Sequence, residues 1–233
     1  MNNILEQLKI LSKALPLEDY FTWNIPGGCP LDIPENISDN YSRNIYLKEH
    51  FKKHLENDDG LFNHYWVIQE WGSIRSFKKM GRNNDRILEF KKGLIQGKLT
   101  KPTFNLISSL SKIAAFLNPK EYAIYDSRAI YALNWLIFCY SDITELFPQP
   151  SGRSSILAQY DIQTIFRLSG KKCDFRSYKT AYFDYCNFLK SISKEVYGDE
   201  APYKVEMLLF LAAPTKIIDS IKSSVTLKIN PSA

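Results

Sequence analysis

The chain has 233 residues, 45% of them hydrophobic and 14% aromatic, so it is long enough to bury one large core or two small lobes. Its net charge is +5, and its four cysteines are too far apart for a disulfide framework or a zinc knuckle. The longest apolar stretch, residues 130–140, contains Asn134 and is too short to cross a bilayer. The N-terminal segment is amphipathic and does not resemble a signal peptide, so we expect a cytoplasmic protein with reduced thiols and no membrane contact.

Helical periodicity dominates the chain and predicts an all-α fold. Residues 16–42 are rich in Pro, Gly, Asn and Asp and are expected to form a long loop, as are residues 147–154. Residues 225–229 are either a short strand or a frayed tail. Asn84 or Asp85 is expected to cap one helix, and Thr100 to cap the next, with Pro102 in its first turn. The expected helices span residues 2–14, 43–57, 61–71, 84–97, 111–117, 127–140, 155–167, 174–196 and 201–213, and a further helix starts near Pro102.

The whole chain, 1–233, is expected to be one helical unit and a monomer, because it contains no internal repeat and no low-complexity segment. Its two ends, residues 1–74 and 146–233, are expected to pack together as one lobe. Residues 75–145 then form the other lobe.

Basic residues are concentrated in one part of the chain, between Arg75 and Lys101, which we call the basic segment. Only Asp85 and Glu89 oppose them there. Such a segment on a nearly neutral chain suits a polyanionic partner, although it is equally typical of a solvated helix face. Its basic residues are Arg75, Lys78, Lys79, Arg82, Arg86, Lys91, Lys92, Lys98 and Lys101.

The most informative stretch is residues 108–128. Lys112 is expected in the first turn of a short apolar helix that ends at Asn118-Pro119, and Asp126 at the start of the next apolar helix. A lysine becomes nucleophilic when desolvation or nearby positive charge, here that of a helix N-terminus, lowers its pKa. The spacing therefore predicts an amine and a carboxylate at the mouths of two packed helices.

Each of these residues also has a purely structural interpretation. A lysine at a helix end commonly extends its amine to the surface, and Lys112 fits that pattern. Aspartate before an apolar helix is a common N-cap, and Asp126 fits that pattern too. The capping and catalytic roles of Asp126 are compatible, because one carboxylate oxygen can cap while the other faces a cleft.

The stretch resembles the core of the helix-hairpin-helix DNA glycosylases, especially the 8-oxoguanine glycosylases and their shorter bacterial relatives. Ser111-Lys112-Ile113-Ala114 is similar to the step that carries the Schiff-base lysine, and Ile124-Tyr125-Asp126-Ser127-Arg128 to the step that carries the catalytic aspartate. The family hairpin usually has two glycines before the lysine. Here Ser108 and Leu110 stand at those places, so a hairpin of another shape is expected over residues 105–111.

The resemblance implies a two-lobed, all-α glycosylase with a cleft between the lobes. Its partner would be double-stranded DNA with a damaged or modified base, which is flipped out of the stack. Lys112 would attack the sugar C1′ and displace the base, with Asp126 as its activator, and β-elimination from the Schiff base would nick the strand. Neither a metal nor an organic cofactor is required.

Several further residues are expected to contact the nucleic acid. Trp71 and Phe147, near helix ends, are the expected walls of the base pocket. The expected contacts to the DNA backbone are Arg75, Lys78, Lys79, Arg82, Ser108, Ser109, Ser111 and Arg128.

Two other classes of function compete with this one. A non-catalytic nucleic-acid-binding protein would keep the basic segment and use Lys112 as a phosphate contact. A HEPN-type ribonuclease would use an arginine followed by a histidine, a loose spacing that Arg43 and His50 fit. His50 and His54 are also four residues apart, but no third metal ligand is apparent, so no metal site is expected.

Overall fold

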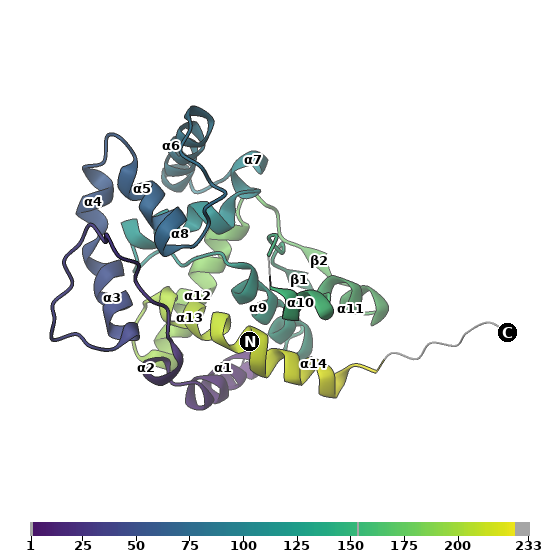
Figure 1. Cartoon of the computed structure of the whole chain (residues 1–233). Helices are drawn as coiled ribbons and strands as arrows, with labels where there is room; N and C mark the ends of the chain where they lie inside the picture. Colours follow the sequence, from purple (N-terminus) through teal and green to yellow (C-terminus); the bar gives the residue numbers. More distant parts are fainter. Residues whose placement is uncertain (1, 153, 227–233) are drawn as a thin grey trace.

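A computed structural model describes residues 2–152 and 154–226. It confirms the expected all-α fold (Figure 1). The sheet structure in these residues is a single parallel pair of two-residue strands, β1 (Glu145–Leu146) and β2 (Asp174–Phe175). No helix in this part of the chain is long and apolar enough to cross a membrane.

Helices of the first half begin and end close to the predicted positions, except that α2 was not predicted and lies within residues 16–42, the expected loop. Asp39 starts α3 three residues early because its side chain accepts from Ser42 N at 2.7 Å, and Phe51 separates α3 from α4. Trp71 lies in a π-helical turn, η1, rather than in a continuous α-helix. These elements are α1 (Asn2–Ala14), α2 (Leu17–Tyr20), α3 (Asn40–His50), α4 (Lys52–Glu56), α5 (Phe62–Trp66) and η1 (Val67–Trp71).

The predicted caps of the next two helices had different outcomes. Helix α6 (Gly81–Gln96) starts before Asn84, so the expected cap at Asn84 or Asp85 is wrong: Asn84 Oδ1 instead accepts from Tyr65 OH at 2.8 Å. The expected cap of α7 (Lys101–Phe104) is confirmed, since the Thr100 side chain accepts from Thr103 N.

Helices of the second half depart more from the prediction. Residues 155–167 form two helices because Asp161 caps a new one, and residues 174–175 pair with β1 before α12 begins. The helix after α13 was not predicted. The elements are α8 (Ile107–Leu117), α9 (Ser127–Tyr140), α10 (Ser155–Gln159), α11 (Ile162–Leu168), α12 (Ala181–Tyr197), α13 (Pro202–Ala212), the π-helical η2 (Ala213–Ile217) and α14 (Ile218–Ser224). Val225 and Thr226 are in no helix or strand, and residues 227–229 lie outside the described residues.

Packing places α8 and α9 against different partners (Figure 1). Helix α8 packs on α3, α4, α6 and η1, whereas α9 packs on α1, α13 and η2. Helices within residues 75–145 therefore contact both of the flanking parts of the chain. The segment between α8 and α9, residues 118–126, begins with a turn at residues 119–121 and connects the two sets of helices.

Candidate functional site

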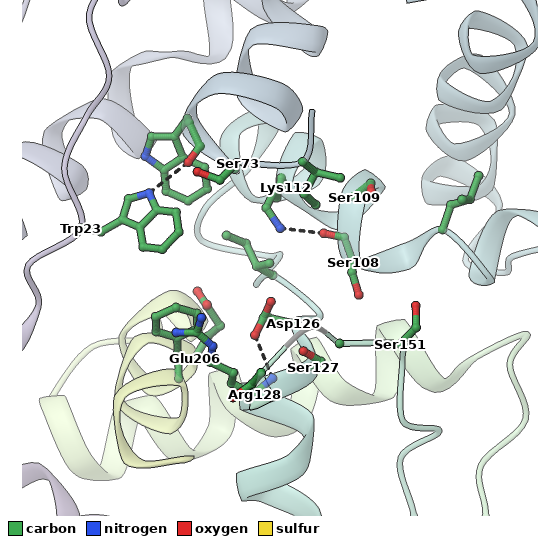
Figure 2. A pocket seen from close by; sticks show the side chains of 18 of the residues that line it. Trp23, Ser73, Ser108, Ser109, Lys112, Asp126, Ser127, Arg128, Ser151 and Glu206 are labelled. Carbon is green, nitrogen blue, oxygen red and sulfur yellow. Dashed lines mark hydrogen bonds between the residues drawn. The ribbon is translucent and has the colours of Figure 1, made fainter. Parts of the chain in front are cut away.

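One pocket, which we call the central pocket, has a volume of about 660 Å³. Lys112 and Asp126 both line it, and Figure 2 shows them on facing walls. This volume lies within the usual range for small-molecule sites, roughly 300–1,000 Å³. The pocket is also lined by serines from four segments of the chain: Ser73, Ser76, Ser108, Ser109, Ser127, Ser151 and Ser154.

Lys112 lies in the middle of α8, because the helix begins at Ile107. The expected first-turn position is wrong: Ser108 and Leu110 continue the helix, and the turn that precedes it is at Asn105 and Leu106. The influence of a helix dipole is confined to the first turn, so the dipole is not what perturbs this amine. Burial is the main cause of the lowered pKa of Lys112, and Asp126 and Glu206 oppose the shift.

The side chain of Lys112 is 6% exposed, and it does not extend into bulk solvent. Its stem crosses Gly72, where an added Cβ would lie 2.5 Å from Lys112 Cδ. Its amine donates to Ser108 O at 2.7 Å (Figure 2). A glycine at the end of η1 thus leaves room for the lysine stem on its way to the pocket.

Asp126 is the N-cap of α9 as predicted, with Oδ1 accepting from Arg128 N at 2.8 Å. Its side chain is half-buried and lines the pocket, so the cap and the pocket share one carboxylate. The preceding backbone is held by buried hydroxyls: Tyr185 OH donates to Ile124 O at 3.1 Å, and Tyr125 N donates to Ser111 Oγ at 2.9 Å. The position of Asp126 is therefore fixed by both α12 and α8.

Trp71, which was predicted to be a wall of the base pocket, lines the central pocket. Two aromatic residues that the sequence analysis missed, Trp23 and Phe210, line it as well. Trp23 lies 6.1 Å from Trp71 and 5.8 Å from Phe210, centroid to centroid. Trp23 Nε1 donates to Trp71 O at 3.0 Å, and Trp71 Nε1 donates to Asn44 Oδ1 at 2.9 Å. Hydrogen bonds thus orient both indoles.

Phe147 does not line the pocket, so its predicted role as a wall is wrong. It is 1% exposed and packs edge-on against Tyr185 at 5.9 Å. Asn134 explains its position, since its amide bonds both the backbone N and the backbone O of Phe147, at 2.9 and 2.8 Å. The loop after β1 is thereby drawn into the core.

The sequence analysis also missed two buried charged residues, Glu206 and Lys48. Glu206 on α13 lines the pocket and is 4% exposed, while Lys48 on α3 is 1% exposed. Lys48 Nζ lies 4.9 Å from the Trp71 ring centroid. Neither Lys48 Nζ nor Glu206 Oε2 has a hydrogen-bond partner among the described residues. Burial lowers the pKa of Lys48 to about 8 and raises that of Glu206 to about 7, and each charge opposes the shift of the other.

The residues predicted to contact the DNA backbone differ in how deeply they are buried. Ser108, Ser109 and Arg128 line the pocket, with the Arg128 guanidinium 4.4 Å from the centroid of the Phe210 ring. Ser111 is fully buried and bonded to Tyr125 N, so its expected contact with nucleic acid is wrong.

The four residues of the basic segment that were predicted to contact DNA do not line the pocket. Arg75, Lys78, Lys79 and Arg82 are exposed, and Lys79 Nζ lies 3.0 Å from the Phe62 ring centroid. Ser73, Ile74 and Ser76 line the pocket, so the rim continues directly into the basic segment.

Arg43 and His50, the pair expected of a HEPN-type ribonuclease, are not in this pocket. Arg43 donates to Ile37 O at 3.1 Å, and His50 stacks on Tyr46 at 4.1 Å. His54 packs against Phe51. No cluster of three or more His, Cys, Asp or Glu side chains suited to a metal occurs within residues 2–152 and 154–226.

Two of the missed residues, Trp23 and Glu206, are unusual for their surroundings in the sequence. Trp23 is a large aromatic within a loop rich in Pro and Gly, and Glu206 is the single acid in an apolar helix. Lys48 is followed closely by Lys52 and Lys53 in the sequence, so only the packing distinguishes it. Comparison with protein-family models, with curated proteins and with solved structures gave no match to this chain.

Proposed function

We propose that this protein is a DNA base-excision glycosylase with AP-lyase activity. The observation that carries the proposal is the placement of a buried lysine, Lys112, opposite a carboxylate, Asp126, in one pocket. An amine whose pKa is lowered by desolvation is a better nucleophile, because more of it is neutral.

The pocket suits a flipped nucleotide. A base inside a duplex is out of reach of a nucleophile, so excision requires a pocket that accepts the extruded base. Trp23, Trp71 and Phe210 offer aromatic surface for a base, and the serines offer hydroxyls for its polar edge or for the sugar. The exposed basic segment beyond the rim suits the phosphates on either side.

In the proposed reaction, neutral Lys112 attacks C1′ while the bond from C1′ to the base breaks. Asp126 accepts the proton that the lysine nitrogen loses and stabilises positive charge on the sugar. Ring opening gives a Schiff base, and β-elimination from it nicks the strand. Duplex DNA with a damaged or modified base is the proposed partner.

Borohydride reduction tests the proposal, because it converts the Schiff base into a stable crosslink to DNA. We expect the wild-type protein to be trapped on a duplex that contains an abasic site, and Lys112→Gln to bind that duplex without being trapped. Lys120→Gln, at an exposed lysine, is the matched control and should trap normally. Binding without trapping by the wild type would instead favour the non-catalytic nucleic-acid-binding protein.

A further inference from the structure

Glu206 occupies a position in the central pocket to which the proposed reaction has so far given no role. Figure 2 shows it on the same side of the pocket as Asp126, facing Lys112. Its Oε2 atom is buried without a hydrogen-bond partner in the described residues. A buried carboxyl group with an unsatisfied oxygen is destabilising, so its presence in an apolar helix indicates a function.

The proposed reaction leaves one proton unassigned. When the bond from C1′ to the base breaks, its electron pair goes to the base nitrogen, and a neutral leaving base must gain a proton. Asp126 is already assigned to take the proton of the lysine nitrogen, and its Oδ1 accepts from Arg128 N, so a second carboxyl group is needed for the proton of the leaving base. Two carboxyl groups in different environments commonly divide into one ionised and one acidic partner.

The environment of Glu206 favours the protonated form of its carboxyl group, which would make it the acidic partner. It comes from the apolar helix α13, and Lys48, the cation that most favours its ionised form, makes no hydrogen bond to it within the described residues. The other titratable groups around it are Lys112 on α8, Asp126 at the start of α9, and Tyr185 and Cys186 on α12.

We propose, resting on the glycosylase function above, that Glu206 is a general acid that protonates the departing base, and that Lys48 positions and tunes that proton. The bond between C1′ and the base breaks as the bond between C1′ and Lys112 Nζ forms. The proton of Glu206 passes to the base nitrogen, and Glu206 is left ionised beside the Lys48 ammonium.

Single-turnover excision against pH tests this role. The probe is a set of duplexes that carry 8-oxoguanine, uracil or an alkylated purine, from which the base that the wild type excises is chosen. Loss of the Lys112 proton raises the rate with pH, whereas the acid must stay protonated, so the wild-type profile should have a limb on which the rate falls as Glu206 ionises, near pH 7. Glu206→Gln should lower the rate by about 10²–10⁴-fold and abolish that fall.

Trapping on an abasic-site duplex is the internal control, because that substrate has no base to protonate. Glu206→Gln should trap as the wild type does, which also shows that the variant folds. Lys48→Met supplies a second arm: without the cation, the pKa of Glu206 rises further, so the fall in rate should move to higher pH.

The outcomes separate the two proposals. A wild type that neither traps nor excises overturns the glycosylase function and this role with it. If the wild type is active, unchanged excision by Glu206→Gln overturns the role of Glu206 alone. Equal loss of excision and of abasic-site trapping in Glu206→Gln also overturns that role. Weaker substrate binding with an unchanged pH profile overturns it too, and would make Glu206 a binding group.

Discussion

Two buried pairs of an acidic and a basic side chain in the described residues, Asp58 with His64 and Lys48 with Glu206, differ in how completely they are bonded. Asp58 accepts from Phe62 N, Asn63 N and His64 N at 2.7–3.0 Å and contacts His64 Nδ1 at 2.7 Å. In the described part of the chain, by contrast, no hydrogen bond joins Lys48 to Glu206, and neither Lys48 Nζ nor Glu206 Oε2 has a partner; His64 Nε2 also lacks one, but both oxygens of Asp58 are bonded.

The bonded pair has a structural purpose. It closes the first turn of α5 after Leu61, whose φ of 56° is unusual for a residue with a side chain. Burial lowers the pKa of His64, and the Asp58 hydrogen bond opposes the shift.

Of the pair without a mutual hydrogen bond, Glu206 lines the central pocket together with Lys112 and Asp126, and Lys48 Nζ lies 4.9 Å from the centroid of the Trp71 ring. Folding alone would favour a bonded or an apolar replacement there, because an unsatisfied buried charge is destabilising. The difference therefore distinguishes a carboxylate that serves the fold, Asp58, from one that is available to a ligand, Glu206.

The largest expected effect is on the rate of base excision, with no change in the stability of the fold. Asp126→Asn should lower base excision by about 10²–10⁴-fold, because a neutral amide neither accepts the lysine proton nor stabilises a cation. Asparagine caps a helix about as well as aspartate, so the free energy of unfolding should stay the same. Single-turnover excision and urea denaturation measure the two effects, and excision at the wild-type rate would leave Asp126 as a cap only.

The second prediction is a loss of stability without a loss of the chemistry. Asp58→Ala should lower the free energy of unfolding by about 3–5 kcal/mol, because it removes the partner of the buried His64 Nδ1 and the acceptor of three backbone N–H groups. The fraction that remains folded should still trap abasic DNA, since Asp58 does not line the pocket. A stable Asp58→Ala protein that fails to trap would contradict this division.

The smallest effect is expected from exposed charge. Lys78, Lys79 and Arg82 changed together to Gln should weaken duplex binding and flatten the slope of log affinity against log salt by about 0.9 for each phosphate that is no longer neutralised. The same change at Lys13, Lys120 and Lys222, which are also exposed, is the control. An identical slope in both triple variants would make the basic segment an ordinary solvated surface.

The amino-acid sequence by itself determined the helical class, the N-cap at Asp126, the cap at Thr100 and the presence of Lys112 in an apolar helix. These features follow from local periodicity and from side chains that bond their own backbone within three residues. For the same reason, the extent of α9 agreed with its prediction.

Only the tertiary structure decided where Lys112 lies in α8, which aromatic residues face the pocket, and that Lys48 and Glu206 are buried close enough for their charges to interact. Asn134 draws Phe147 into the core across 13 residues of chain, and β1 captures residues 174–175 from a predicted helix. Contacts between residues this far apart depend on how the helices pack, and no local pattern encodes them. The pocket therefore became visible only when η1, α8, α9 and α13 were brought together.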